Sequence, residues 1–520
     1  MNLRRVVGSW LCAALLGAGA AAAEDVRLVV VLCVDQMRPD TLTRFDGEYR
    51  GGLRRLLDGG LRFDCVHDHA LTLTGPGHAV LLTGCHPRST GIALNGWRDR
   101  RTLRPVYCVD DPAHPVHGRS AGGRSPRRLR RDALGDWLRR RDPRARVYSV
   151  AGKDRAAVLM GGRFPDAAYW YDRARGGFAS STYYHPGGLP DWVEAFRGDG
   201  WLAALPETWS YEPSPHLRPD DDPRESPRFG RASPHPLRDR DLRRTLAHLY
   251  VSPFLDAAVL RFARALVERR DLGGDAACDL LCVGLSATDT VGHLYGPFSQ
   301  EIRDVTLRLD RELGRLFAFL DRRGAPYLVV LTSDHGVLPL ADVRSVDGAA
   351  MAKELGRALA ARLGPGRWTS LAPGRAPSSN VYVHPRVPAT DRARVRRVLV
   401  EVLSAREAVY ERGRLLAREP AGDALLDLAR KSYVPDRCGD VFFFLEPGRL
   451  FRHSAGVTSH GAPHPYDREV PLVFWGPGIE AGTGRGAART VDIAPTLAAR
   501  LGLSPPPGVD GTVLALAASE

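Results

Sequence analysis

The chain has almost no lysine. Of its 520 residues, 73 are Lys or Arg, and only Lys153, Lys353 and Lys431 are lysines. The formal net charge of +13 is scattered among 60 acidic residues and forms no basic stripe, so the sequence gives no indication of nucleic-acid binding. We attribute the excess of arginine to a coding bias. Each remaining lysine therefore needs a local reason.

The sequence also lacks any long apolar run after its first residues. Residues 1–23 have the pattern of a cleavable secretory signal, with a basic start, an apolar stretch and a small-residue cleavage site before Glu24. No later run approaches the roughly 18 apolar residues that a bilayer-spanning helix needs. We therefore expect a periplasmic or secreted protein without a transmembrane segment. A lipoprotein anchored at Cys12 is the alternative, although the residues before this cysteine make a poor lipid-attachment sequence.

Cysteine is scarce as well, and no C-x-x-C pair is present, which argues against a structural zinc site built from thiolates. Cys33, Cys278 and Cys282 lie in apolar runs and are expected to be buried thiols. Four others could form two disulfides in an oxidising compartment, in any of three pairings: Cys65, Cys85, Cys108 and Cys438.

What the sequence does contain is a series of short apolar runs rich in β-branched residues. Such runs are typical of strands buried on both faces of a parallel sheet, and they occur at residues 26–34, 145–151, 278–285, 326–331 and 470–475. Helix-period segments lie between them, for example at residues 255–269 and 301–322. This alternation predicts an α/β protein with helices on both faces of the sheet. A hydrophobic content of 44% excludes a disordered chain.

Two segments interrupt the alternation. Residues 173–250 are rich in Pro, Trp, Tyr and charge, and we interpret this insertion as a solvated loop. Its run Asp220-Asp221-Asp222 is interpreted as part of the loop and not as a calcium site. Residues 341–450 have helix and strand patterns of their own, which indicates an inserted cap. We expect the rest of residues 24–520 to form one catalytic domain.

Carboxylates and imidazoles gather beside the predicted strand ends, where open α/β sheets bind their ligands. They are Asp35, Asp289, His293, Asp334 and His335, each after a strand, and His460, which precedes the last one. An Asp in such a place is often only a helix cap, and a single His is usually a surface or core residue. The combination favours metal binding, because imidazole and carboxylate without thiolate are typical of catalytic zinc sites that keep an open position. Six such residues are enough to hold two ions.

Thr74 begins the sequence Thr-Gly-Pro-Gly-His, and an apolar run follows. Pro and Gly in a first turn predict that Thr74 lies at the N-terminus of a helix, where it could be a simple cap. Beside two metal ions the same position suits a nucleophile, because a helix N-terminus favours an anion and a metal lowers the pKa of a bound hydroxyl.

These motifs, in this order, resemble the alkaline phosphatase superfamily, and most closely its Thr-nucleophile bacterial alkaline phosphatases, which are related to the nucleotide pyrophosphatase/phosphodiesterases. The resemblance covers nearly the whole mature chain. It implies a three-layer α/β/α sandwich with a mostly parallel sheet and two Zn²⁺ ions per chain. It implies that one zinc is held by Asp289, His293 and His460, and the other by Asp35, Asp334 and His335 together with Thr74, the nucleophile. It also implies that Asn95 hydrogen-bonds a phosphate oxygen.

Lys153 and Arg155 follow the predicted strand at residues 145–151. Lys153 could be an accidental surface residue, but in a chain that uses arginine almost everywhere it indicates a need for a compact point charge. In the phosphomonoesterases that the chain resembles, the matching Lys and Arg contact the non-bridging oxygens of the substrate, and related diesterases lack the pair. Because a monoester dianion has more charge on these oxygens than a diester, the pair favours monoesters.

We therefore expect an exported phosphomonoesterase that hydrolyses small phosphate esters through a phospho-threonine intermediate. A phosphodiesterase or nucleotide pyrophosphatase on the same scaffold is the alternative, and an inactive metal-stabilised binding protein is a remote one. Cys85-His86-Pro87-Arg88 is similar to the sulfatase signature, but its Arg comes one position early and Thr74 stands where the sulfatase Cys would be. We assign no role to His67 and His69, and we interpret His464 as a possible neighbour of the metal ligands.

Overall fold

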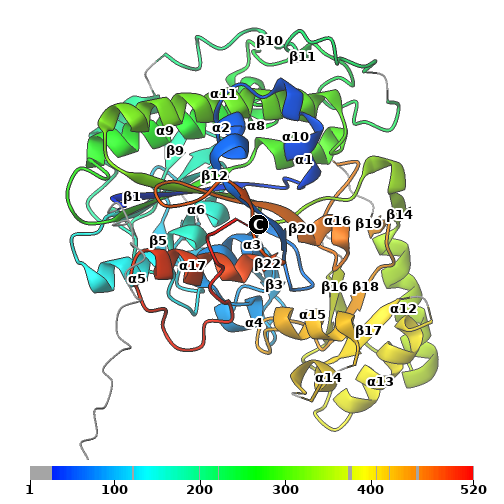
Figure 1. Cartoon of the computed structure of the whole chain (residues 1–520). Coiled ribbons are helices and arrows are strands. Elements are labelled where there is room, and N and C mark those ends of the chain that lie inside the picture. The colour runs from blue at the N-terminus through cyan, green and yellow to red at the C-terminus, as the bar shows by residue number, and fades with distance from the viewer. Residues whose placement is uncertain are drawn as a thin grey trace, which may run out of the picture.

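A large central sheet organises the chain. The computed structural model describes residues 26–119, 122–197, 200–220, 222–372, 378–405, 407–417, 419–420, 422–451 and 456–518. The signal interpreted in residues 1–23, with Cys12, lies outside these residues. The sheet has ten strands in the order β21-β2-β20-β13-β1-β12-β7-β8-β9, with β22 beside β2 (Figure 1). The strands are β1 (Leu28–Val34), β2 (Leu61–Val66), β7 (Val147–Ala151), β8 (Ala167–Asp172), β9 (Gly177–Ala179), β12 (Asp279–Leu285), β13 (Tyr327–Thr332), β20 (Glu469–Trp475), β21 (Gly482–Thr483) and β22 (Ala488–Arg489).

The middle of this sheet is parallel. β1 pairs in parallel with β12 on one side and β13 on the other, so that Val30 lies opposite Leu281 and Val329. β7 and β8 continue in the same direction. β20 runs antiparallel to β13, because the chain leaves the sheet at the end of β13 and returns at the same edge after the cap. The predicted α/β class with a mostly parallel sheet is confirmed.

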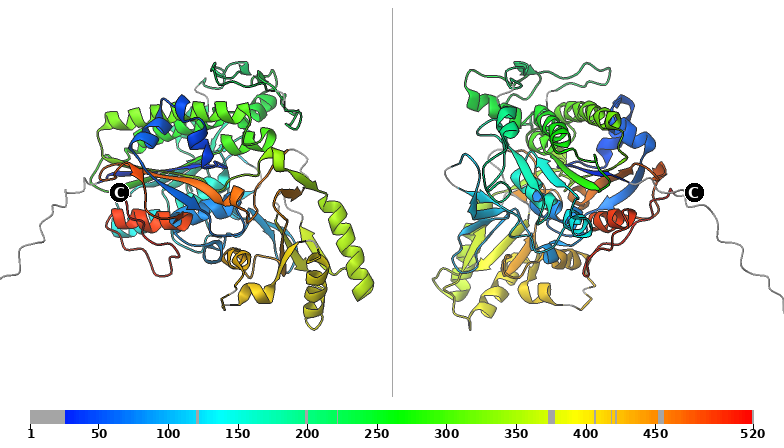
Figure 2. Two further views of the ribbon diagram at one scale, coloured as in Figure 1. Left: turned by 45° about the vertical axis from the view of Figure 1, so that its right-hand side comes forward. Right: turned by 90° about the vertical axis from the view of Figure 1, so that its left-hand side faces the viewer.

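Helices cover both faces of the sheet (Figures 1 and 2). One face carries α2 (Gly52–Gly59), α9 (Phe254–Arg270), α10 (Ala287–Tyr295) and α11 (Gln300–Arg323). The other carries α3 (Thr74–Thr83), α5 (Leu134–Arg141), α6 (Asp154–Gly161) and α17 (Ile493–Arg500). Successive residues of β1 enter opposite cores, since Val30 and Leu32 pack in one cluster while Val29 and Val31 pack in the other. This arrangement is the expected three-layer sandwich, and it explains the continuous apolar runs.

The cap (residues 341–450) contains a separate four-stranded antiparallel sheet, in the order β15-β16-β18-β17. Its elements are β14 (Arg344–Val346), α12 (Gly348–Leu363), β15 (Thr369–Ala372), β16 (Ser378–Val383), α13 (Arg392–Leu403), β17 (Ala408–Glu411), α14 (Arg412–Leu416), α15 (Ala424–Ser432) and β18 (Val441–Phe444), followed by β19 (Arg449–Phe451). Leu355 and Leu399 of its helices pack on Phe443 in a core of their own. The entering strand β14 and the leaving strand β19 pair with each other in parallel.

The insertion (residues 173–250) is not the solvated loop that its composition indicated. It contains α7 (Asp191–Arg197), the short pair β10 (Thr208–Trp209) and β11 (His235–Pro236), and α8 (Leu242–Tyr250). Trp209 is buried and donates a 2.7 Å hydrogen bond from Nε1 to Asp304 on α11. Leu246 and Leu249 of α8 are buried as well. The expectation failed because the apolar residues of this segment are spaced irregularly between charges, and they bury against helices that are distant in sequence.

Neither of the two disulfides that the sequence allowed is formed. All seven cysteines of the described residues are free. Cys65 packs in the core on one face of the sheet, while Cys108 and Cys438 pack in the core on the other. Cys85 has a different neighbour, with its Sγ 3.6 Å from the carbonyl oxygen of Gly508.

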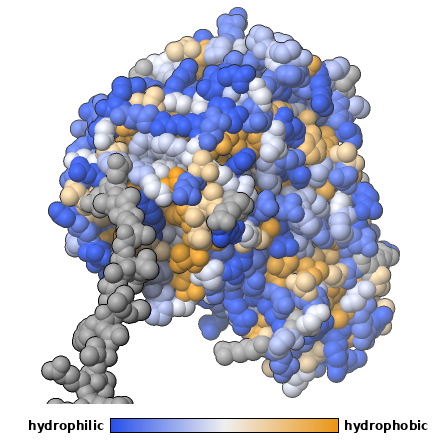
Figure 3. Space-filling view, viewed as in Figure 1, coloured by the Kyte–Doolittle hydropathy of each residue, from blue (hydrophilic) through white to orange (hydrophobic). Residues whose placement is uncertain are grey.

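The surface is largely polar. On the face shown in Figure 3, hydrophilic residues predominate and apolar ones form only small groups. Among the residues that the structure describes, no helix is both long enough and apolar enough to cross a bilayer.

Candidate active site

Three parallel neighbours in the sheet bring three aspartates to one edge. Asp35 follows β1 directly, Asp289 lies in the first turn of α10 after β12, and Asp334 follows β13. Because β1 lies between β12 and β13, their carboxyl ends meet, and so do these side chains. His335 comes with Asp334. His460 enters from the loop before β20.

The six metal-ligand candidates form two groups, in each of which the ligand atoms lie within 4.8 Å of one another. In the first, Oδ1 of Asp289 lies 3.3 Å from Nε2 of His293 and 3.5 Å from Nε2 of His460. In the second, Nε2 of His335 lies 3.5 Å from Asp35 Oδ1 and 3.3 Å from Asp334 Oδ2. The rings of His335 and His460 stack with centroids 3.4 Å apart, so the two groups adjoin.

All three imidazoles are oriented by the backbone. Nδ1 of His293, His335 and His460 lies 2.9, 3.0 and 2.9 Å from the carbonyl oxygens of Thr458, Gly336 and Thr72, respectively. A carbonyl only accepts, so Nδ1 carries a proton and Nε2 is the nitrogen that faces the carboxylates. Burial lowers the pKa of His335 to about 4 and, with His335 beside it, holds that of His460 well below its usual range. Both imidazoles are therefore neutral, as metal ligands must be.

The buried atoms of these groups fit divalent cations. Asp35 Oδ1, Asp334 Oδ2 and His335 Nε2 are buried and have no hydrogen-bond partner. Burial, with Asp289 and Asp334 nearby, raises the pKa of Asp35 well above its usual range. Orphaned carboxylate and imidazole atoms that converge in this way are the donor set expected of a two-metal hydrolase site.

Thr74 is the first residue of α3 and is 1% exposed. Its Oγ1 accepts a 3.2 Å hydrogen bond from Nη2 of Arg155. The backbone N–H of Gly75 donates a 2.6 Å bond to Oδ1 of Asn95, which ties this amide to the same helix terminus. The N-terminus of α3, with its partial positive charge, thus opens on the two ligand groups.

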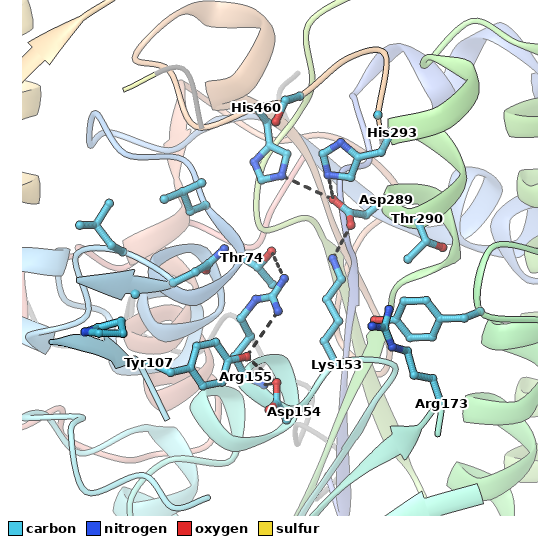
Figure 4. Close-up of a pocket in the computed structure, with 18 of the residues that line it drawn as sticks. Thr74, Tyr107, Lys153, Asp154, Arg155, Arg173, Asp289, Thr290, His293 and His460 are labelled. Carbon is cyan, nitrogen blue, oxygen red and sulfur yellow. Dashed lines mark hydrogen bonds and ion pairs between the residues drawn. The ribbon is translucent and has the colours of Figure 1, made fainter. Parts of the chain in front are cut away.

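Lys153 and Arg155 enter from the start of α6 (Figure 4). The Nζ of Lys153 lies between the carboxylates of Asp35 and Asp289. Burial alone would lower the pKa of Lys153, but these two carboxylates outweigh it and raise the pKa above the usual value. Arg155 contacts the hydroxyl of Tyr107 at 3.4 Å, and that hydroxyl donates to Asp154 at 2.6 Å. Arg155 is thus held against Thr74, while Lys153 is held against the aspartates of the two ligand groups.

A cavity of about 1470 Å³ is lined by Thr74, Asn95, Lys153, Arg155 and the group of Asp289, His293 and His460. Both segments that interrupt the α/β alternation also contribute to its walls. The cap contributes Asn380 and Tyr382, and the insertion contributes Arg173, Arg228, Phe229 and Tyr250. The two segments therefore shape access to Thr74.

Several residues at the site have no clear sequence signal. Gln36 has φ of 68° and donates from its backbone to Asp334 at 3.1 Å and from Nε2 to Asp289 at 2.9 Å. His78 lies one turn after Thr74, with Nδ1 3.1 Å from Asp334 Oδ2. Their positions beside Asp35 and Thr74 are the only hints in the sequence. His464 was expected near the metal ligands but instead contacts the carbonyl of Leu445 at 2.9 Å.

Comparisons with known proteins agree with this geometry. A profile of the family described as type I phosphodiesterase / nucleotide pyrophosphatase matches residues 29–467. The alkaline phosphatase PhoK of a Sphingomonas species is 34% identical, over 97% of this chain and 93% of its own, and the alkaline phosphatase PafA of Elizabethkingia meningoseptica is 30% identical, over 96% and 97%.

Solved structures of related proteins have the same fold. The crystal structure of wild-type PafA matches with a TM-score of 0.85 at 29% identity, and the match covers 95% of this chain and 99% of that one. Murine ectonucleotide pyrophosphatase / phosphodiesterase 5 matches at a TM-score of 0.56 and 16% identity, over 93% and 97% of the two chains, which is a likeness of fold. The chain is thus a phosphoric ester hydrolase that belongs to the type I phosphodiesterase / nucleotide pyrophosphatase family and is homologous to the bacterial alkaline phosphatases.

Proposed function

We propose that the protein is an exported alkaline phosphatase that hydrolyses phosphate monoesters through a phospho-threonine intermediate on Thr74. The observation that carries the proposal is the position of Thr74 Oγ1, at a helix N-terminus, 3.2 Å from the Arg155 guanidinium and in the same cavity as Lys153 and the group of Asp289, His293 and His460. The export is proposed from residues 1–23 alone.

We infer that the two groups hold Zn²⁺, one ion with Asp289, His293 and His460, the other with Asp35, Asp334, His335 and Thr74. When bound, the ions would lower the pKa of the Thr74 hydroxyl and neutralise charge on the oxygen that leaves. The protein's contribution is to keep three imidazoles in one tautomer and three carboxylates desolvated before any ligand arrives.

In the proposed first step, Thr74 Oγ1 attacks phosphorus in line, the bond from phosphorus to the ester oxygen breaks, and an alcohol leaves. Water then cleaves the phospho-threonine bond and releases inorganic phosphate. The side chains of Asn95, Lys153 and Arg155 hold the equatorial oxygens, where negative charge is spread in the transition state. In support, PafA has been crystallised as a variant substituted at one Thr, one Asn, one Lys and one Arg, the same four residue types that surround this cavity.

A phosphodiesterase is the second candidate, because the family description names that activity. The pair of Lys153, which is buried, and Arg155, which contacts Thr74, argues for monoesters, since two fixed cations match a dianion better than a monoanion. We expect kcat/KM for an aryl phosphate to exceed that for the bis-aryl phosphate. A preference for the diester would refute the assignment to monoesters and leave the nucleophile untouched.

The nucleophile is tested by Thr74→Ala, with Thr369→Ala in the cap as a control outside the cavity. We expect Thr74→Ala to retain its metal content and to lose at least about 10³-fold in kcat, because covalent catalysis is abolished. Trapping of phosphate on the wild-type chain at acid pH, and its absence in the variant, would complete the test. A near-normal rate in Thr74→Ala would overturn the mechanism.

A further inference from the structure

A second cluster of metal-ligating side chains lies outside the cavity, where the insertion meets α11. It consists of Asp220, His235 and Glu301, whose ligand atoms lie within 4.8 Å of one another. Asp220 and His235 flank the part of the insertion that leads into β11, and Glu301 is the second residue of α11. We propose that these three residues bind a divalent cation, separate from the active-site ions, that fixes the insertion against the sheet domain.

Glu301 provides the first argument, because its carboxylate is buried and faces only one basic group, the imidazole of His235. The residue is 0% exposed, and neither carboxylate oxygen has a hydrogen-bond partner. Oε1 lies 3.1 Å from Nε2 of His235. A buried carboxylate that accepts no hydrogen bond is unfavourable, so the cluster is incomplete as it stands.

The hydrogen bonds around His235 supply the second argument. Its Nδ1 lies 3.3 Å from the carbonyl oxygen of Phe229, which only accepts, so Nδ1 carries a proton and Nε2 is the ring nitrogen left to bind an ion. The Tyr211 hydroxyl lies 3.2 Å from Nε2 and donates its hydrogen bond to Asp220 at 2.7 Å. Asp220 Oδ2 accepts from the Tyr211 hydroxyl and from the backbone N–H of Ser233, whereas both oxygens of Glu301 have no donor. The side chains of Asp220, His235 and Glu301 thus converge with ligand atoms to spare, as in an empty ligand set.

Charge balance is the third argument. The carboxyl of Glu225 lies close enough to Glu301 and Asp220 that burial and these two neighbours raise its pKa to about 9. Within the part of the chain that the structure describes, no Lys or Arg forms an ion pair with Asp220, Glu225 or Glu301. Protonation of His235 would supply one positive charge against two facing carboxylates, whereas a divalent ion would neutralise both.

The donor types indicate which ion. Imidazole with carboxylates suits Zn²⁺ or Mn²⁺, while Ca²⁺ and Mg²⁺ prefer oxygen alone. Ligands at about 2.0–2.2 Å from zinc in a tetrahedron are separated by about 3.4 Å, so small movements would close the present cluster around an ion.

The position of the cluster explains what such an ion would do. The chain between Asp220 and His235 contains Arg228 and Phe229, which line the active-site cavity. The same stretch is joined to the end of α10 by two bonds, from Ser226 N to the Leu294 carbonyl at 2.9 Å and from the Tyr295 hydroxyl to the Gly230 carbonyl at 3.0 Å. In Figure 1, β10 and β11 lie over α11 on the outer side of that helix layer. An ion here would hold one wall of the cavity in place without touching substrate.

The test counts metal in the full-length mature protein. Wild type, Glu301→Gln and His235→Ala are equilibrated with ZnCl₂, freed of excess by gel filtration, and analysed by mass spectrometry. His216→Ala, an exposed histidine of the same insertion, is the matched control. We expect both cluster variants to hold one zinc equivalent fewer than wild type and control. Equal zinc content in all four proteins would overturn the proposal.

Thermal unfolding gives an independent readout with opposite signs. If an ion binds, Glu301→Gln removes a ligand and lowers the Tm measured in the presence of zinc. Adding zinc then raises the Tm of Glu301→Gln by less than it raises the Tm of His216→Ala. If no ion binds, Glu301→Gln removes a buried unpaired charge and raises the Tm, which would also refute the proposal. This test is independent of the proposed phosphatase mechanism, because Thr74→Ala leaves Asp220, His235 and Glu301 unchanged. If that mechanism were wrong, wild type would still hold one zinc equivalent more than Glu301→Gln and His235→Ala.

Discussion

At the scale of single residues, Lys153 is the clearest case of a side chain placed for one purpose. In a chain that otherwise uses arginine, its ammonium is buried between Asp35 and Asp289 and lines the cavity. A planar guanidinium is larger and fixed in its fork geometry, whereas an ammonium fits as a compact charge among carboxylates. Lys431 has a comparable structural role, since its Nζ lies 2.8 Å from Asp68, whereas Lys353 is exposed.

Replacing Lys153 with Met should therefore change substrate preference. We expect kcat/KM for an aryl monoester to fall by about 10²–10³-fold, as for other lost transition-state donors, and the value for the diester to fall far less. Lys353→Met, on the exposed side of the cap, is the control and should match wild type in both assays. If kcat/KM fell equally for both substrates, Lys153 would have a structural role and no part in selecting monoesters.

A second residue-scale prediction concerns pH. Asp256 on α9 is 3% exposed and accepts hydrogen bonds from the backbone of Ser286 and Ala287 at 2.7 and 3.0 Å, at the start of α10. Burial raises the pKa of Asp256 to about 7, so the folded state holds a proton that the unfolded chain releases near pH 4. The sign follows: this group's stabilising effect is full below pH 4 and is lost as pH rises to about 7.

Asp256→Asn should remove that loss, because the amide resembles the protonated acid. We expect the variant to match wild type near pH 4 and to be more stable at pH 8, by at most about 4 kcal/mol. Urea unfolding at both pH values measures the difference. A parallel shift of stability at the two pH values would show that the carboxyl does not titrate between them.

At the scale of elements, the approach of α3 to the end of β13 brings Thr74 and Asp334 together. Gly77 makes this approach possible, since a Cβ there would lie 2.3 Å from the backbone oxygen of Asp334 and 2.7 Å from its Cβ. Both distances are far below van der Waals contact, so any larger residue must push the Asp334 turn away from the helix.

Gly77→Ala should accordingly impair metal binding more than folding. We expect the variant to lose zinc from the group of Asp35, Asp334 and His335 and to lose at least tenfold in kcat, measured by metal analysis and steady-state assay. Gly356→Ala on α12 is the matched control, because its Cβ meets no atom within 4 Å. The control should gain about 0.5–1 kcal/mol in stability at unchanged activity. Normal zinc content in Gly77→Ala would contradict the argument.

The arrangement of the strands and helices also explains which site residues could be predicted from the sequence. Asp35, Asp289 and Asp334 follow strands whose apolar runs are unmistakable, and parallel strands deliver their ends to one edge, so local patterns sufficed to group them. Gln36 contacts Asp289 and Asp334, and His78 contacts Asp334, each of which lies more than 250 residues along the chain, and no local pattern marks such contacts. Trp209 and the cluster around Glu301 were missed for the same reason, because their partners belong to helices far along the chain.

At the scale of the whole molecule, the structure holds together without covalent cross-links among the described residues. Two continuous cores flank the sheet and a third fills the cap, and nearly all of the free thiols lie inside these cores. Burial raises the pKa of Cys108 and Cys438 to about 12, so little thiolate is present at neutral pH. Thiols in this state are slow to oxidise even in an oxidising compartment.

Thiol titration of the mature protein tests this arrangement. In denaturant without reductant, we expect all of Cys33, Cys65, Cys85, Cys108, Cys278, Cys282 and Cys438 to react, and we expect added reductant to leave the Tm unchanged. Finding that four of these thiols are blocked until reduction would restore the two disulfides. A Tm that falls in reductant would lead to the same conclusion.

The pairing of β14 with β19 has an evolutionary consequence. The chain leaves the sheet domain and returns to it through two strands that lie side by side, between His335 upstream and His460 downstream. Because the cap has its own core, it can be exchanged, lengthened or trimmed through this narrow stalk while the sheet and its ligands stay in register. Diversification of leaving-group preference therefore requires no redesign of the catalytic machinery, and Asn380 and Tyr382 are the first positions that such an exchange would alter.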